Sequence, residues 1–273
     1  MNLRRIWPSF RGELPQPEDL RLKLLHFRTE DTASPETGLS KVIPGHFNSR
    51  RQPVIICGTH GGGTSFLTKM LRYCGLFVGH DVEPFKARKF HESESFRAIN
   101  ILLFEELGGD KHGMNDQFIR DYISNFNNGE LRTRMEAGIE SKLMEAKERF
   151  SAGDSTVFER PWGWKDPRNS VNLHFWLRHF PEAKILMVKK EERTKRSRSV
   201  SGKWFRESTD FQREFYYNPR PVLDLDRLAA NRILTIQFED ITSRQETFDI
   251  ATGFCGLDRH PLSGVLKACR YEE

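Results

Sequence analysis

The amino-acid sequence predicts an α/β fold: a parallel sheet of the P-loop type, flanked by helices on both faces, in a single domain. An apolar run at residues 53–57 breaks into glycines and then resumes with helical spacing. Further apolar runs alternate with helical stretches along the rest of the chain. Such alternation is typical of a parallel sheet covered by helices, in which ligands bind at the carboxyl ends of the strands. We therefore expect the binding site at that edge of the sheet.

The expected strands are short apolar segments bounded by polar residues or glycine. They cover residues 53–57, 156–164, 184–188 and 233–238. Helical stretches are expected between them, at residues 171–179 and 193–204. The glycine-rich segment and several lysines fall directly at strand ends, so three strands present N–H groups or positive charge to one crevice.

A longer helix is expected before the second strand. Its apolar positions recur at about 3.6 residues, and they are Leu131, Met135, Ile139, Leu143 and Phe150. We interpret this stripe as a face that packs on the core. Residues 1–50 are rich in proline and charge, and we expect them to form an N-terminal extension packed on the domain at residues 51–273.

The segment after the first strand predicts a phosphate-binding loop. Three successive glycines allow backbone N–H groups to converge on an anion, and the following helix adds the positive end of its dipole. We expect contacts with a phosphate-bearing ligand from His60, Gly61, Gly62, Gly63, Thr64 and Ser65. Thr64 stands where the Walker A pattern has its lysine, which disfavours a nucleotide kinase or an ATPase.

A second signal lies downstream, in Trp162-Gly163-Trp164-Lys165-Asp166-Pro167-Arg168 and in the run from Phe180 to Lys190. Together with the glycine loop, these segments resemble the P-loop sulfotransferases of bacterial type, which are related to the tyrosylprotein and carbohydrate sulfotransferases. Such enzymes move a sulfuryl group from 3′-phosphoadenosine 5′-phosphosulfate (PAPS) to an acceptor. The resemblance covers residues 53–257.

Smaller pieces of the family pattern occur in the expected order. Phe90-His91-Glu92, Asn100 and Leu107-Gly108-Gly109 resemble its aromatic-Glu, Asn and L-G-G elements. Phe238-Glu239-Asp240-Ile241 resembles the Y-E-D-L that closes the last strand, and Phe254-Cys255-Gly256-Leu257 resembles the F-L-G-L of the final helix. It is the ordered set that carries the resemblance.

The resemblance implies roles for individual residues. The loop would hold the 5′-phosphosulfate, and Lys165 of the K-D-P element would contact the transferring group. A basic residue at the end of the third strand would hold the 3′-phosphate together with Ser197. The alignment with the family pattern leaves open whether this residue is Lys189 or Lys190. The general base is open among four candidates, which are His80, Asp81, His91 and Glu92. The chemistry requires no metal.

One departure from the family pattern bears on activity. Gly61 occupies the loop position where the family usually carries Arg or Lys. Our first interpretation is a PAPS-dependent sulfotransferase acting on a hydroxyl or amine of a carbohydrate, a peptide or a small metabolite. The alternatives are a non-catalytic nucleotide-binding protein of the same fold and a nucleotide kinase with a degenerate loop.

Composition is ordinary for a globular protein. The 273 residues carry a formal net charge of +5 and a pI near 9.0, which suits an anionic ligand without indicating nucleic acid. Taken by itself, the basic run at 193–203 is interpreted as a solvated helix face in preference to a nucleic-acid patch, and the family resemblance adds a role in holding the 3′-phosphate. The four cysteines have no C-x-x-C spacing, so we expect buried free thiols. With no apolar segment long enough to span a bilayer, we expect a cytoplasmic protein.

Overall fold

The structure is a computed structural model. It describes residues 51–82, 91–106, 117, 129–190, 216 and 230–271. All of them belong to a compact unit formed by residues 42–273. The expected N-terminal extension at residues 1–50, the expected helix at 193–204 and Ser197 lie outside the described residues.

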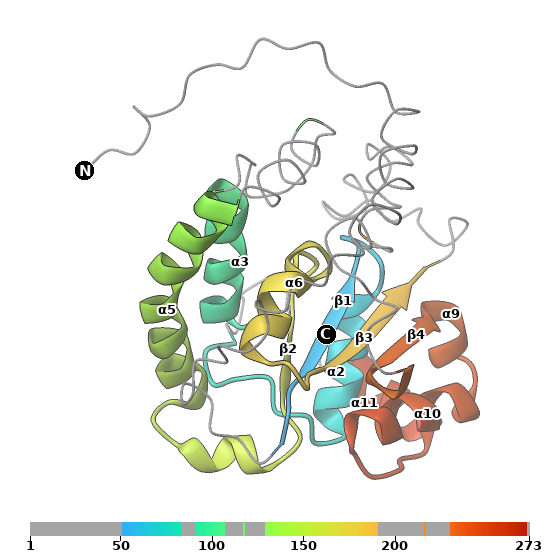
Figure 1. The fold of residues 1–273 in the computed structure, drawn as a ribbon. Helices are drawn as coiled ribbons and strands as arrows, with labels where there is room; N and C mark the ends of the chain where they lie inside the picture. The colour runs from blue at the N-terminus through green and yellow to red at the C-terminus, as the bar shows by residue number, and fades with distance from the viewer. Residues whose placement is uncertain are drawn as a thin grey trace. The chain divides into compact units, whose positions relative to one another are not determined.

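The described strands form a parallel sheet, in agreement with the predicted fold class. They are β1 (Val54–Gly58), β2 (Gly163–Lys165), β3 (Lys184–Lys189) and β4 (Ile233–Gln237), in the order β2-β1-β3-β4 (Figure 1). Every neighbouring pair is parallel, with Gly58 opposite Val188 and Ile56 opposite Lys165. The carboxyl ends of all strands therefore lie at one edge.

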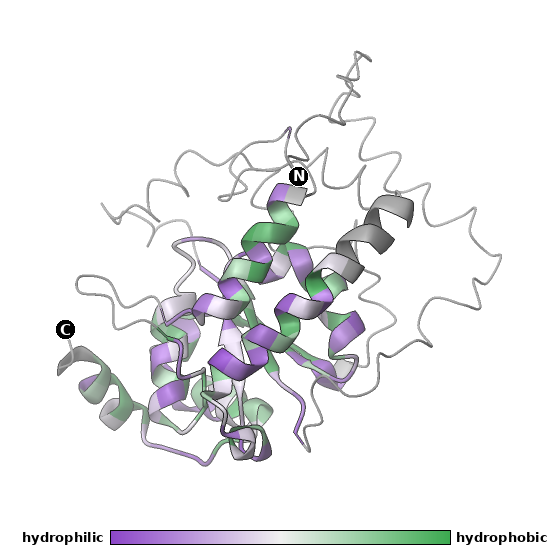
Figure 2. Ribbon diagram, turned by 90° about the vertical axis from the view of Figure 1, so that its left-hand side faces the viewer, coloured by the Kyte–Doolittle hydropathy of each residue, from purple (hydrophilic) through white to green (hydrophobic). Residues whose placement is uncertain are grey.

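One face of the sheet packs on α3 (Glu94–Glu106), α5 (Gly129–Ser151) and α6 (Asn169–His179). Its centre is aromatic: the rings of Phe96 and Trp164 stack at 4.3 Å, and the Trp176 ring meets Trp164 edge-on at 4.9 Å. Along the helices facing the viewer in Figure 2, hydrophobic residues alternate with hydrophilic ones, as expected for helices with one packed face.

The other face packs on α2 (Thr64–Tyr73), α10 (Gln245–Cys255) and α11 (Leu262–Tyr271). Neighbouring residues of a strand point to opposite faces, so Ile55 and Cys57 enter the first core while Val54 and Ile56 enter the second. Burial on both faces explains why these strands read as continuous apolar runs. The expected helices on both sides of the sheet are confirmed.

The expected strand at 156–164 is wrong over its first half. Ser155–Glu159 form a 3-10 helix, η2, and the strand is confined to Gly163–Lys165. The Asp154 carboxylate accepts hydrogen bonds from the Thr156 N–H (2.9 Å) and the Thr156 hydroxyl (2.6 Å), which favours a helical turn over an extended chain. At Gly163 a Cβ would clash with the Val54 carbonyl, so only glycine fits there.

The two motifs near the C-terminus also lie elsewhere than expected. Phe238–Ile241 form a short helix, α9, directly after β4, rather than closing the strand itself. Residues 254–257 end α10, where Gly256 has φ 73° and caps the helix, and α11 follows them. A further 3-10 turn, η5 (Ala230–Arg232), precedes β4.

Two sequence expectations concern the chain as a whole. Within the described ranges, no helix has the length and apolar character needed to cross a membrane. The cysteines behave as expected, because Cys57, Cys74, Cys255 and Cys269 are all buried and free.

The buried thiols should be unreactive in the folded protein. Burial raises the pKa of Cys74 to about 11 and that of Cys255 to about 12, and it raises the pKa of Cys57 further still. Since the thiolate is the reactive species, a disulfide reagent at pH 8 should modify none of these thiols until denaturant is added. Rapid labelling of the native protein would show that this core opens readily.

Candidate functional site

The loop that follows β1 has the backbone geometry of an anion-binding turn. Gly61 and Gly63 have φ angles of 77° and 88°, a region that other L-residues rarely adopt. The Gly62 N–H donates to the Thr59 carbonyl (3.0 Å) and closes the turn. Gly63 is the N-cap of α2 and provides no side-chain cap, so the helix presents its N-terminal N–H groups toward the loop.

The base of this loop is fixed to α6. The Gly58 N–H donates to the Ser170 hydroxyl (3.0 Å), in the first turn of that helix. A Cβ on Gly58 would lie 2.7 Å from the Val188 carbonyl oxygen and 2.8 Å from a methyl carbon of Thr64. The loop is therefore held by β3 and α6 before any ligand binds.

Lys165 ends β2 and lies in an ion pair away from water. Its ammonium is 2.7 Å from Glu92 Oε1, and the two side chains are 1% and 16% exposed. The second oxygen of Glu92 is 3.5 Å from Arg97 Nε. Because Lys165 is opposite Ile56 in the parallel pair, its side chain leaves β2 on the side of the sheet that packs on α2, next to the strand that leads into the loop. A buried charge requires such a partner.

A second buried pair follows directly in the chain. The guanidinium of Arg168 donates to both carboxylate oxygens of Asp166, at 2.9 and 3.0 Å, and the Arg168 N–H adds a third bond at 2.8 Å. Burial raises the pKa of the Asp166 carboxyl, while Arg168 opposes the shift. Burial lowers the pKa of Arg168, but Asp166, with smaller contributions from Glu92 and Tyr216, offsets this effect, and the pKa is raised overall. Asp166 thus folds the chain back at the start of α6.

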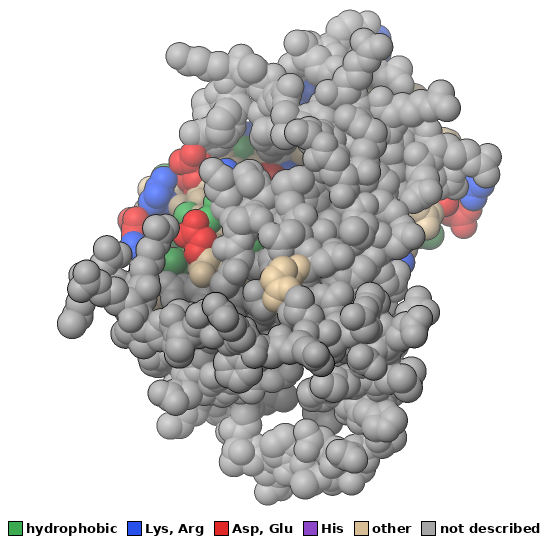
Figure 3. Space-filling view, turned by 90° about the horizontal axis from the view of Figure 1, so that it is seen from above, with side chains coloured by type: hydrophobic (Ala, Val, Ile, Leu, Met, Phe, Trp, Pro, Cys, Tyr) green, Lys and Arg blue, Asp and Glu red, His purple; other side chains and the backbone are tan. Residues whose placement is uncertain are grey.

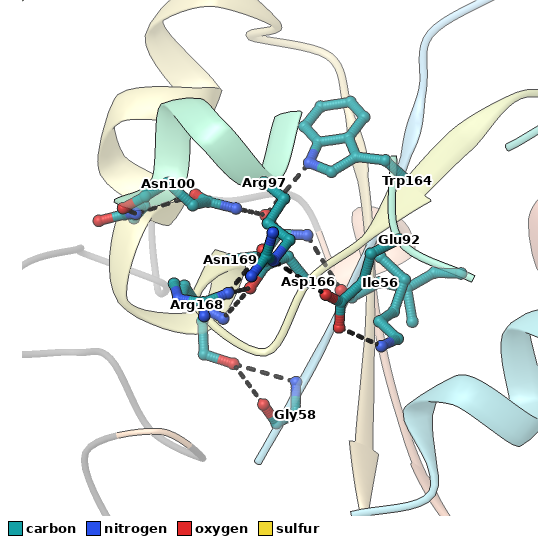
Figure 4. Close-up of polar contacts among 12 residues, drawn as sticks. Ile56, Gly58, Glu92, Arg97, Asn100, Trp164, Asp166, Arg168 and Asn169 are labelled. Carbon is teal, nitrogen blue, oxygen red and sulfur yellow. Dashed lines mark hydrogen bonds and ion pairs between the residues drawn. The ribbon is translucent and has the colours of Figure 1, made fainter. Parts of the chain in front are cut away.

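Three buried asparagines connect α3, α6 and β1 (Figure 4). Asn100 donates to Asn169 Oδ1 (2.9 Å), and Asn172 donates to Asn100 Oδ1 (2.9 Å). Asn169 also donates to the Ile56 carbonyl (3.1 Å), beside the last residue of the short strand β2. The indole N–H groups of Trp164 and Trp176 complete the network. It fixes the helix that follows Glu92 against the helix that follows Lys165.

Figure 3 looks onto the carboxyl ends of the strands, and the acidic and basic side chains that lie side by side at its left belong to the side of the molecule where α3 and α5 lie. Among the residues that the structure describes, no cluster of three or more His, Cys, Asp or Glu side chains could hold a metal ion. The site therefore combines a loop of N–H donors with paired charges.

The model of the sulfotransferase family matches residues 53–260. The chain belongs to the sulfotransferase family. Among solved structures it is similar to the sulfotransferase domain from the curacin biosynthetic pathway, with 13% identity and a TM-score of 0.41 over 78% of this chain and 77% of that one. It is also similar to sulfotransferase STF9 from Mycobacterium avium, with 14% identity and a TM-score of 0.42 over 81% of this chain and 67% of that one. No curated protein sequence matches the chain.

Family membership confirms the resemblance noted from the sequence motifs, and it supports a sulfotransferase activity in general terms. The matched segment contains the glycine loop, the K-D-P element and the last strand. The four candidates for the base in this sulfotransferase have different surroundings. The structure pairs Glu92 with Lys165, whereas His80 is exposed and its ring meets Phe77 at 5.1 Å.

The hydrogen bonds of Asp81 indicate a structural role rather than a catalytic one. Its Oδ2 accepts from the Ser93 hydroxyl and from the Ser95 N–H, both at 2.9 Å, and so holds the first turn of α3. His91 is buried with a φ of 54°, a left-handed conformation just before Glu92. Both residues therefore shape the chain around Glu92.

The strand-end lysines point to opposite faces of the sheet. Side chains alternate along β3, so Lys189 is on the same side of the sheet as Ile185 and Met187, which face α6. Lys190 directly follows the strand, and its ammonium lies 4.7 Å from the centre of the Phe238 ring. Ser197, the third expected ligand of the 3′-phosphate, lies outside the described residues.

Sequence reasoning missed Arg97 and the asparagine network. Asn100 matched a family pattern, but no local signal separated Asn169 and Asn172 from ordinary polar positions in a helix. Their function depends on contacts over 69 and 72 residues of sequence, which periodicity does not reveal.

Removing the carboxylate from the buried pair of Asp166 and Arg168 should destabilise the fold strongly. Asp166→Asn leaves the Arg168 guanidinium buried without its carboxylate, and we expect a loss of about 3–5 kcal/mol in the free energy of unfolding. Urea denaturation measures the loss. The control is Arg149→Met, which removes an exposed pair with Glu94 and should cost less than about 1 kcal/mol. Equal losses in the two variants would contradict the assigned role of burial.

Proposed function

We propose that this sulfotransferase moves the sulfuryl group of PAPS to a hydroxyl or amine acceptor, with Lys165 and Glu92 as the reacting pair. The proposal is carried by their contact of 2.7 Å. Lys165 is on β2, which is next to β1, the strand that leads into the glycine loop. An ammonium and a carboxylate held together are the acid and the base that sulfuryl transfer needs. The family match supports the reaction class.

The chemistry is an in-line displacement at sulfur. The acceptor oxygen or nitrogen forms the new bond to sulfur, the bond from sulfur to the bridging oxygen breaks, and its electron pair stays on the departing phosphate. Lys165 donates a hydrogen bond to that oxygen as negative charge develops there. Glu92 accepts the proton of the acceptor. The N–H groups of the loop and of the first turn of α2 hold the 5′-phosphate.

The other end of the nucleotide is assigned to the strand-end lysines. Lys189 or Lys190, together with Ser197, holds the 3′-phosphate, and no step requires a metal. The acceptor is a carbohydrate, a peptide or a small metabolite. Four free, buried thiols are typical of a reducing compartment, which favours a cytoplasmic location.

Gly61 supports an alternative. The family usually carries a basic side chain at this loop position, and its absence favours a protein that binds the nucleotide without transferring the sulfuryl group. Turnover distinguishes the two functions, because both bind the nucleotide.

Nucleotide binding should be measurable as thermal stabilisation. The desulfated product, 3′-phosphoadenosine 5′-phosphate, should raise the melting temperature without added metal, because in this proposal the loop and the strand-end lysines bind its phosphates. At 100 times its dissociation constant the ligand adds about 2.7 kcal/mol of stability. ATP with Mg²⁺ is the control. A larger shift with ATP would favour a kinase, and no shift with the desulfated product at millimolar concentration would refute the assigned donor.

Lys165 should be needed for turnover more than for binding. Lys165→Met preserves the buried volume but removes the donor to the leaving oxygen, so we expect turnover to fall about a hundredfold or more, with affinity for the product nucleotide nearly unchanged. The assay follows labelled sulfate from PAPS to a panel of sugars, phenols and peptides.

The matched control for this variant is Lys142→Met, on the exposed side of α5, which should keep full activity. Full activity in Lys165→Met would overturn the mechanism. If the native protein binds the nucleotide but transfers nothing to any acceptor, the non-catalytic alternative is correct.

A further inference from the structure

We propose that Phe238 is a positioning residue of the donor site, because its ring holds the ammonium of Lys190 beside the phosphate loop. The proposal rests on the donor site argued above and assigns a role to the first residue of the F-E-D-I motif. Two sets of contacts carry it, one to the lysine and one to the loop.

The first contact is a cation over an aromatic face. Lys190 Nζ lies 4.7 Å from the centre of the Phe238 ring. Lys189 pairs with Gln237 in the sheet, so Lys190 and Phe238 are the first residues after the paired ends of β3 and β4. Within the part of the chain that the structure describes, Lys190 makes no hydrogen bond or ion pair. Its N–H donors therefore stay available to an anion while the ring limits where the flexible side chain lies.

The second contact is between the same ring and the loop. A Cβ on Gly63 would clash with the Phe238 ring, so the N-cap of α2 packs directly on its edge. Phe66, in the first turn of α2, meets the ring at 6.1 Å with an interplanar angle of 73°. The ring is thus fixed by the loop and by α2, and the ammonium on its face is fixed relative to the N–H groups that hold a phosphate.

This arrangement fixes the loop, which holds the 5′-phosphate, relative to the lysine that holds the 3′-phosphate. With Gly61 in place of a basic residue, the loop offers no cation from that position, so donor affinity depends more on the strand-end lysine. A lysine that is already ordered before binding loses less side-chain entropy when an anion arrives. Phe238 therefore contributes to nucleotide affinity without contacting the nucleotide through a polar group.

The test is a double-mutant cycle with 3′-phosphoadenosine 5′-phosphate as the probe, measured by calorimetry. Phe238→Leu should weaken binding about three- to tenfold. Lys190→Met should weaken binding at least as much, and the double variant should bind no more weakly than Lys190→Met alone. Phe238→Tyr keeps the aromatic face and should retain wild-type affinity. The non-additive losses at Phe238 and Lys190 are the result that loss of packing alone does not predict.

The chain offers a matched control at the opposite end of the same strand. Lys184 Nζ lies 5.5 Å from the centre of the Phe254 ring and also donates to the Phe254 carbonyl. Phe254→Leu removes the same kind of contact far from the loop, so affinity should stay unchanged. Phe238→Met serves as a second non-aromatic variant if Phe238→Leu fails to fold.

Three results overturn the proposal alone: wild-type affinity in the non-aromatic variants, additive losses at Phe238 and Lys190, or an equal loss in Phe254→Leu. Absence of any binding by the wild-type protein overturns the proposed donor site, and this proposal with it. The two failures are therefore distinguishable.

Discussion

The buried contact between Lys165 and Glu92 is the interaction on which the site depends. The Lys165 ammonium is 1% exposed and has no solvent to replace a lost partner, so it is stable only while the geometry of the pair is held. Lys165 ends β2, and Glu92 precedes α3, so the pair exists only if that strand and that helix keep their relative positions. Arg97 forms a second ion pair with the other oxygen of the carboxylate.

The asparagine network provides that geometry. Amides buried among tryptophan and phenylalanine rings are costly unless their hydrogen bonds are made, and here each of the three asparagines is hydrogen-bonded. Apolar packing alone tolerates small sliding of helices, whereas a hydrogen bond at 2.9 Å does not. The network therefore defines how α3 and α6 sit on β1, and through them how Glu92 meets Lys165.

The glycine loop after β1 is shaped by backbone conformation rather than by charge. Gly61 and Gly63 adopt left-handed angles, so a basic side chain at Gly61 would be strained as well as different in charge. Positive charge instead comes from β2 and from the end of β3, on strands adjacent to the loop. The difference from the family pattern at Gly61 therefore has a structural reason. The backbone conformation at this position suits glycine, and the positively charged side chains are on strands instead.

The sequence by itself determined the parallel sheet, the glycine loop and the lysines at the end of β3, because these follow from local periodicity and glycine content. It also determined the free thiols, because the cysteines lack the spacing of a metal site or a disulfide framework. It placed Lys165 and Glu92 among the candidates through the family motifs but left four choices for the base. Only the tertiary structure brought Glu92 to Lys165 across 73 residues, gave Asp81 its role in holding α3, and turned residues 155–159 into a 3-10 helix. Pairing of buried charges and amides is a property of residues distant in sequence, and local patterns carry no record of which partner each one meets.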